Sequence, residues 1–251
     1  EGKGMHHDQM VADFLGTGKP QVLSWFQGGK TLLLYPIPEN PKDTSAWSPI
    51  VVIEGMTGEG LAAADVDGDG LRDILAGGRW FKHEGDGRFA AYVIDAAQTE
   101  GRVAAGDLKP GGHVEVVMVL GDGVGPLTWY ECTGDPAQED AWTGHALLDH
   151  DVDHGHSLEV LDVNGDGHLD VFCAEMARWG LGDPGTDNPD AKAWVFYGDG
   201  AGGFEKQEIA SGFDFHECKM ADVNGDGRPD LVAKPFAWET PRLDLWLNLK
   251  N

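Results

Sequence analysis

The sequence is short of basic residues, of cysteine and of long hydrophobic runs. Lys and Arg total 18 against 43 Asp and Glu, which gives a formal net charge of -25 over 251 residues. Because such a chain repels phosphate groups, we expect neither nucleic acid nor an anionic membrane as a partner. The acidic residues fall into short clusters and not along helix faces, a distribution that favours bound cations over a diffuse solubilising surface.

Few cysteines and few apolar runs exclude further classes of protein. Cys132, Cys173 and Cys218 are too few and too scattered for a disulfide framework or a cysteine zinc site, so we expect buried thiols. No apolar run approaches the roughly 20 residues needed to cross a bilayer, and no membrane insertion is expected. The chain starts at Glu1 without a signal-like region, which indicates a trimmed start and leaves an export signal open.

Amphipathic helical patterns are also lacking, and 37 glycines leave little room for a fold that alternates helices with strands. What the sequence does contain is a repeat, an Asp-rich nonapeptide followed by an apolar run. Three copies are intact, and two eroded copies keep the first Asp and the glycines. Intervals of 52, 42, 55 and 60 residues between the copies are typical of four-stranded propeller blades. The copies occupy residues 13–21, 65–73, 107–115, 162–170 and 222–230.

We therefore predict an all-β fold, a β-propeller of about five four-stranded blades, with part of a seven-bladed propeller as the alternative. A single domain is expected over residues 1–251, and its fifth unit ends one strand short. Apolar runs separated by Gly- and Asp-containing turns mark the strands, most clearly in the fourth unit. The five units are expected near residues 5–54, 57–98, 99–150, 154–212 and 214–251.

The intact nonapeptides have the composition of calcium loops. Positions 1, 3, 5 and 9 carry carboxylate or carboxamide oxygens, and Ca²⁺ prefers six to eight oxygen ligands. Position 12 lacks the Glu of an EF-hand, and we expect about three Ca²⁺ ions that stabilise strand-flanked loops. The competing interpretation is a set of simple Asp-Gly turns, which we prefer for the eroded copies at Asp13 and Asp107. The expected ligands are Asp65, Asp67, Asp69, Asp73, Asp162, Asn164, Asp166, Asp170, Asp222, Asn224, Asp226 and Asp230.

This pattern, Asp-x-Asp/Asn-Gly-Asp-Gly-x-x-Asp before an apolar strand, resembles the FG-GAP or VCBS repeat family over essentially the whole chain. The resemblance implies a propeller, usually of seven blades. That family contains integrin-like propellers, lectin-like domains and some sugar lyases, so the resemblance does not select a function.

A second pattern appears when the five units are aligned on the first Asp. Six residues upstream stand His7, Glu59, Gly101, His156 and His216. In a propeller this position begins the innermost strand at one mouth of the central channel, so the side chains are expected to converge. Imidazole and carboxylate groups together suit Zn²⁺ or another divalent transition metal with an open coordination position. The alternative is that these histidines are hydrogen-bonded structural residues.

The loop after the second strand of each unit is expected to border the same mouth, because adjacent strands run antiparallel. These loops carry aromatic rings beside charged groups, which suits a carbohydrate with its flat sugar faces and polar hydroxyls. Tryptophan packed between blades is the alternative interpretation for any single ring. The predicted substrate-binding residues are Trp25, Trp80, Glu175, Trp179 and Trp238.

Short motifs at residues 154–157, 216–217 and 234–235 resemble the propeller of aldos-2-ulose dehydratase-type sugar dehydratases and isomerases. The resemblance implies a metal-dependent lyase, dehydratase or isomerase that acts on a keto-sugar or uronate-type saccharide. In such a reaction the metal acts as a Lewis acid while a base removes a proton. The predicted base is His154, and Lys234 or Arg178 stabilises the developing enolate.

A non-catalytic alternative is a lectin-like or adhesion propeller whose Ca²⁺ loops only stabilise the scaffold. Both hypotheses make a carbohydrate the expected partner. Loops of this type are filled more readily at millimolar Ca²⁺ than in cytosol, so we expect an extracellular or periplasmic protein. The oligomeric state stays open.

Overall fold

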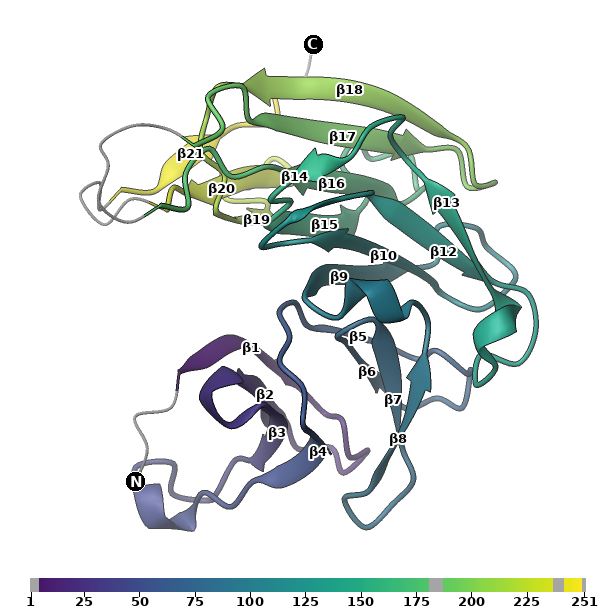
Figure 1. Cartoon of the computed structure of the whole chain (residues 1–251), viewed down its shortest axis with the longest axis vertical. Coiled ribbons are helices and arrows are strands. Elements are labelled where there is room, and N and C mark those ends of the chain that lie inside the picture. The colour runs from purple at the N-terminus through teal and green to yellow at the C-terminus, as the bar shows by residue number, and fades with distance from the viewer. Residues whose placement is uncertain (1–4, 181–186, 237–241, 250–251) are drawn as a thin grey trace.

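The computed structural model describes residues 5–180, 187–236 and 242–249, and its regular structure is almost entirely β-strand. The sequence predicted an all-β propeller, and five small antiparallel sheets confirm this prediction. They follow one another around a common centre (Figure 1). Helix is limited, in the described ranges, to the 3-10 turns η1 (Gln27–Gly29), η2 (Thr44–Ala46), η3 (Ala96–Gln98) and η4 (Glu139–Ala141).

The blades are numbered I to V in chain order. Blade I contains β1 (His6–Ala12), β2 (Gln21–Phe26), β3 (Thr31–Pro36) and β4 (Ile50–Glu54). Blade II contains β5 (Ala62–Ala64), β6 (Asp73–Ala76), β7 (Arg79–His83) and β8 (Phe89–Val93). Blade III contains β9 (Gly101–Gly106), β10 (Glu115–Leu120), β12 (Thr128–Cys132) and β13 (Trp142–Ala146).

Blade V is one strand shorter than the others within the described residues, as the sequence predicted. Its last strand is therefore an edge, and Leu245 on it is exposed.

A separate two-stranded ladder joins β11 (Val124–Gly125) to β14 (Val152–Asp153). Blade IV contains β15 (Ser157–Leu161), β16 (Asp170–Ala174), β17 (Lys192–Gly198) and β18 (Phe204–Ser211). Blade V contains β19 (Glu217–Ala221), β20 (Asp230–Lys234) and β21 (Asp244–Trp246).

The ninth residue of each repeat determines how the first two strands of a blade connect. In blade IV the Asp170 carboxylate accepts hydrogen bonds from Val163 N–H at 2.8 Å and from Gly198 N–H at 2.9 Å. In the eroded first copy, Gln21 Oε1 accepts from Phe14 N–H at 2.8 Å in the same way. Since a neutral amide serves there, the ninth side chain ties down the backbone whether or not an ion is present.

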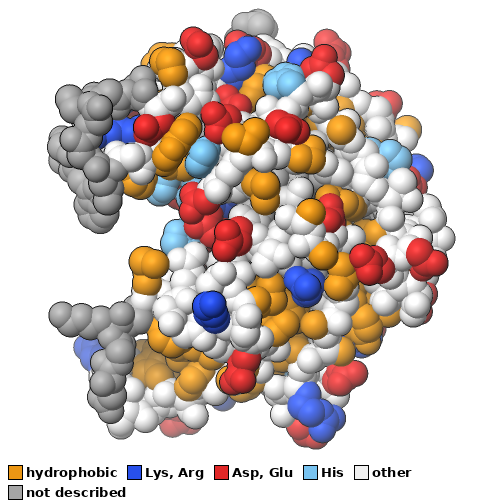
Figure 2. Space-filling view, in the orientation of Figure 1, with side chains coloured by type: hydrophobic (Ala, Val, Ile, Leu, Met, Phe, Trp, Pro, Cys, Tyr) orange, Lys and Arg blue, Asp and Glu red, His pale blue; other side chains and the backbone are white. Residues whose placement is uncertain are grey.

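Four hydrophobic clusters hold the blades together, one at each interface between consecutive blades. Trp25, Trp80 and Trp194 are fully buried in these interfaces, where their large apolar area stabilises blade packing. No such cluster joins blade V to blade I among the residues that the structure describes. The space-filling view shows a notch on that side of the molecule (Figure 2).

The remaining expectations about the scaffold concern thiols and membranes. Cys132, Cys173 and Cys218 are buried and unpaired, which confirms the prediction of buried thiols. The described part of the chain contains no helix long and apolar enough to cross a membrane.

Candidate functional site

The innermost strands bring the histidines and the glutamate of the second pattern together at one channel mouth. His7 Nε2 lies 3.3 Å from Glu59 Oε1, and Glu59 Oε2 lies 3.5 Å from His156 Nε2. The ring of His156 stacks on that of His216, with centroids 4.3 Å apart. The structure therefore shows the convergence that the alignment of the units predicted. We call these four residues the mouth cluster.

Arg102 lies at the centre of the mouth cluster and was missed in the sequence. Its Nη1 lies 3.0 Å from either oxygen of Asp8 in blade I, and Nε lies 3.7 Å from Glu59 Oε2. Its Nη2 donates to His156 Nε2 over 2.7 Å and lies 3.7 Å from Glu217 Oε2 in blade V. A side chain of blade III thus contacts all four other blades. The sequence feature that could have revealed it is its position directly after Gly101, which stands six residues before the first Asp of the third repeat.

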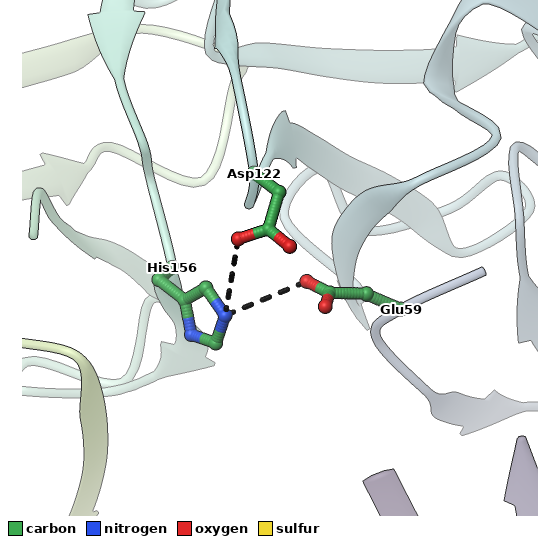
Figure 3. A group of neighbouring side chains, drawn as sticks. All are labelled: Glu59, Asp122 and His156. Atoms are coloured by element: carbon green, nitrogen blue, oxygen red, sulfur yellow. Dashed lines mark ion pairs between the residues drawn. The ribbon is translucent and has the colours of Figure 1, made fainter. Parts of the chain in front are cut away.

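Asp122 was also missed, although it belongs to a group of side chains that could hold a metal ion. One ligand atom each from Glu59, Asp122 and His156 lies within 4.8 Å of the other two (Figure 3). Asp122 follows β10, the second strand of blade III, and such loops were expected to border this mouth. The same rule, applied to the third unit, would have found it. His7 and His216 lie nearby but outside this group.

The histidines of the cluster differ in charge because they differ in burial and neighbours. Burial, followed by the charge of Arg102, lowers the pKa of His156 to about 2, and the same causes lower that of His216 to about 4. Both imidazoles are therefore neutral at pH 7, the form that binds metal. His156 Nδ1 lies 2.7 Å from the backbone carbonyl oxygen of His216. Arg102 Nη2 lies 2.6 Å from Nδ1 as well. In the tautomer with its proton on Nδ1, the carbonyl oxygen of His216 accepts that proton and Nε2 is left as the acceptor or ligand.

His7 and Glu59 hold protons more tightly than isolated side chains do. Pairing with Asp8 is the largest cause that raises the pKa of His7. Burial is the main cause that raises the pKa of Glu59 to about 7, and the charge of Asp122 adds to it. Glu59 Oε2 is buried without a hydrogen-bond partner. An unpartnered buried carboxylate oxygen in an acidic cluster is expected to attract a cation.

Glu59 makes stability depend on pH. Its pKa in the folded protein, about 7, exceeds its ordinary value of 4.5. The contribution of this proton to stability is complete below pH 4.5 and is lost as the pH rises through 7. In EDTA we expect roughly 3 kcal/mol of unfolding free energy to be lost this way. Urea unfolding at several pH values should show that the unfolding free energy falls less steeply with rising pH in Glu59→Gln than in the wild type. Equal slopes would contradict the assignment, since Asp73 titrates in both proteins.

A cavity of about 520 Å³ opens beside the mouth cluster. Imidazoles, carboxylates and one lysine converge on it together with an aromatic ring, so a polar ligand with a flat apolar face fits its chemistry. The lining includes His7, His156, His216, Glu217, Lys234 and Phe236. The structure thus places the predicted enolate-stabilising Lys234 at the site.

The predicted base, His154, does not line this cavity. Its ring stacks on that of Trp179 with centroids 3.7 Å apart, and its Nδ1 pairs with Asp153 Oδ1 at 2.6 Å. Stacking and pairing hold the imidazole outside the lining of this cavity. Arg178 does not line the cavity either.

Most of the predicted sugar-binding residues have structural roles. Trp25 and Trp80 are 0% and 1% exposed, so the prediction that their rings face a saccharide is wrong and the packing alternative holds. Glu175, 7% exposed, accepts backbone hydrogen bonds from Asp153 and Lys192 and thereby joins two strands. The sequence could not separate these side chains from ligand-binding ones, because burial between blades depends on the neighbouring blade. Trp238 lies outside the described residues.

The intact nonapeptide loops have donor groups that fit calcium. In blade II, oxygens of Asp65, Asp67 and Asp73 lie within 4.8 Å of one another, and Asp65 Oδ1 is buried without a hydrogen-bond partner. In blade IV both oxygens of Asp162 accept backbone N–H groups of the loop. Glycine is required inside this loop, because Gly167 has a φ of +89°. Calcium binding itself stays a prediction.

Three comparisons with known proteins bear on this chain. Residues 162–233, which contain the fourth and fifth repeats, match the model of FG-GAP-like repeats. A search of curated proteins found no match. The solved structure of the V. cholerae biofilm matrix protein Bap1 is similar with a TM-score of 0.45 and 19% sequence identity. The match covers 91% of this chain and 35% of that one, so the chain spans about a third of that protein.

Proposed function

We propose that the channel mouth is the active site of a metal-dependent carbohydrate lyase, dehydratase or isomerase that acts on a keto-sugar or uronate-type saccharide. The observation that carries this proposal is the buried Glu59 Oε2, which lacks a hydrogen-bond partner and lies within reach of Asp122 and His156. His156 lines the cavity of about 520 Å³, whereas Glu59 and Asp122 line another. Titratable groups with strongly shifted pKa values concentrate around the Glu59 carboxylate, as they do at catalytic sites.

Glu59, Asp122 and His156 would hold the metal ion. Two carboxylates and a neutral imidazole are a donor set suited to Zn²⁺ and similar divalent ions. When bound, such an ion supplies a Lewis acid that polarises a carbonyl or carboxylate beside the reacting carbon. His216 positions this set, because its carbonyl oxygen lies against Nδ1 of His156 and its ring stacks on the same imidazole.

The proton-transfer step falls to His7 in place of His154. His7 lines the cavity, and the adjacent Asp8 raises its pKa, so its neutral form is a stronger base for a substrate proton and Asp8 stabilises the charge that it gains. Lys234 presents a cationic group to the negative charge that develops on the substrate when the proton leaves. Phe236 offers the cavity an aromatic ring against which a sugar ring can pack.

A second candidate is a non-catalytic carbohydrate-binding or adhesion propeller. Arg102 favours it, because its Nη2 lies 2.7 Å from His156 Nε2, the nitrogen that would bind the metal. If the guanidinium keeps this place, the cluster is an internal ion-pair network and the cavity binds a saccharide without changing it.

Elemental analysis of the purified chain by inductively coupled plasma mass spectrometry separates the two candidates. We expect about one transition-metal ion per chain, lost in the Glu59→Gln/His156→Ala double variant and kept in His150→Ala, whose imidazole lies half exposed outside the cluster. Elimination or isomerisation of keto-sugars and uronates should be lost with it. A wild-type chain that holds only Ca²⁺ and binds sugar unchanged would overturn the enzymatic proposal in favour of the binding module.

We also propose Ca²⁺ in the intact loops and an extracellular or periplasmic location. Carboxylate-rich loops without a preformed cage are filled at the millimolar Ca²⁺ concentrations found outside cells. This ion stabilises the scaffold and takes no part in the chemistry at the channel mouth.

A further inference from the structure

The calcium loop of blade II differs from the others in having a lysine inside its carboxylate cluster. Lys82 extends from β7, and its Nζ contacts Asp67 Oδ2 and lies 2.8 Å from Asp69 Oδ2. These two residues occupy the third and fifth positions of the loop, which are expected calcium ligands. The same two hydrogen bonds raise the pKa of Lys82, so the amine is charged at any physiological pH.

The strand register shows that this lysine is peculiar to blade II. The pairing of Ile74 with Phe81 places Lys82 opposite Asp73, the ninth residue of the loop. None of the residues at the corresponding place in the other blades is basic. Those residues are Pro36, Glu131, Tyr197 and Leu247.

The other intact loops are held by different groups. In blade IV, Asn164 Nδ2 donates to Asp166 Oδ2 at 2.8 Å. Blade V repeats this contact and adds Arg228, which lies in the loop itself and pairs with Asp226 at 3.0 Å. Arg228 therefore neutralises one carboxylate, whereas Lys82 engages two.

The blade II loop nevertheless fits a cation other than Lys82. It carries four carboxylates where the blade IV loop carries three and an amide. Asp65 Oδ1 faces its neighbours buried and without a hydrogen-bond partner, so the ammonium group leaves part of the cluster unsatisfied. A divalent ion would engage Asp65, Asp67 and Asp73 together, but only after Lys82 gives up its contacts.

We infer that Lys82 competes with Ca²⁺ for the blade II loop, which makes this loop fill at a higher Ca²⁺ concentration than the loop of blade IV. The intact loops then fall into two classes by the Ca²⁺ concentration at which they fill. One or two loops are structural and filled first, and the blade II loop responds to changes in Ca²⁺ by exchanging one cation for another. The inference rests on the calcium binding proposed above and is independent of the chemistry at the channel mouth.

Calcium titration of the full chain by isothermal calorimetry tests this competition with Lys82→Met. We expect the weakest Ca²⁺ affinity to tighten by about tenfold or more, because two ion pairs no longer have to be broken. Lys192→Met is the matched control, since Lys192 lies on the third strand of blade IV but pairs with Glu208, outside any loop. Its affinities should equal those of the wild type.

A second readout covers the case in which Lys82→Met folds poorly. In EDTA the four carboxylates of the blade II loop lack a counter-ion in this variant. Its melting temperature should therefore fall below that of the wild type and recover at saturating Ca²⁺. If the wild type binds Ca²⁺ but Lys82→Met has the same affinities and its melting temperature does not recover in Ca²⁺, the competition by Lys82 is overturned and the calcium proposal stands. An absence of Ca²⁺ binding in both chains would instead overturn the calcium proposal.

Discussion

Replacing Arg102 by methionine is expected to lower the free energy of unfolding by about 3 to 5 kcal/mol. The guanidinium is 7% exposed and lies between the carboxylates of Asp8 and Glu59. Its removal takes the permanent positive charge away from the buried Glu59 and the half-buried Asp8, and a buried charge that has lost its partner is strongly destabilising. Arg102 also links blade I to blade V, which share no hydrophobic cluster among the described residues.

Urea unfolding followed by tryptophan fluorescence measures this effect. Arg242→Met is the matched control, because Arg242 is 56% exposed and its pair with Asp244 lies at the surface, where such pairs contribute little. A loss below about 1 kcal/mol for Arg102→Met would show that the guanidinium is not the counter-charge of the cluster. Arg102→Lys, which keeps the charge, should recover part of the loss.

The second large effect is expected for Asp170→Ala, with a loss of about 2 to 4 kcal/mol in unfolding free energy. Asp170 is completely buried and accepts the N–H groups of Val163 and Gly198. Alanine would leave both donors buried without a partner, and each unsatisfied donor carries a desolvation penalty. Because these bonds are made by the protein alone, this loss should already be present in EDTA, with any loss of an ion ligand added to it in Ca²⁺.

The matched control for this prediction is Asp166→Ala in the same loop. Asp166 is exposed, and its carboxylate accepts hydrogen bonds from Asn164 Nδ2 and His168 N–H within the loop, so its removal should matter in Ca²⁺ and change little in EDTA. Thermal unfolding of both variants under both conditions gives the comparison. If Asp170→Ala destabilised the protein only in Ca²⁺, the ninth residue would act as an ion ligand and not as the backbone tie described above.

The sequence predicted the propeller because its information is local and repeated. Each nonapeptide carries its own turn glycines and its own ninth acceptor, so every unit determines the same loop before any contact with its neighbours. The start of each innermost strand could also be predicted, because it lies a fixed number of residues before the first Asp of the repeat. That distance placed His7 and His156 at one channel mouth.

Sequence patterns failed where the outcome depends on which blade lies opposite. The sequence assigned Trp25 and Trp80 to loops at the channel mouth, but they lie in strands β2 and β7, and the adjacent blades bury both rings. His154 lies two residues from His156 but stacks on Trp179 and not at the cavity. In each case the contact depends on which neighbouring segment packs against the side chain, and the alignment of the repeats does not contain that information.

By itself, the sequence determined the repeated blades, their acidic loops and the set of histidines at the channel mouth, because each of these depends on residues close together in one unit. Only the tertiary structure decided what fills the centre. Arg102 and Asp122 come from blade III, a unit whose repeat is eroded, and they meet Glu59 and His156 from other blades. Charge balance at that point is a property of the whole ring, since it sums groups that no single repeat contains.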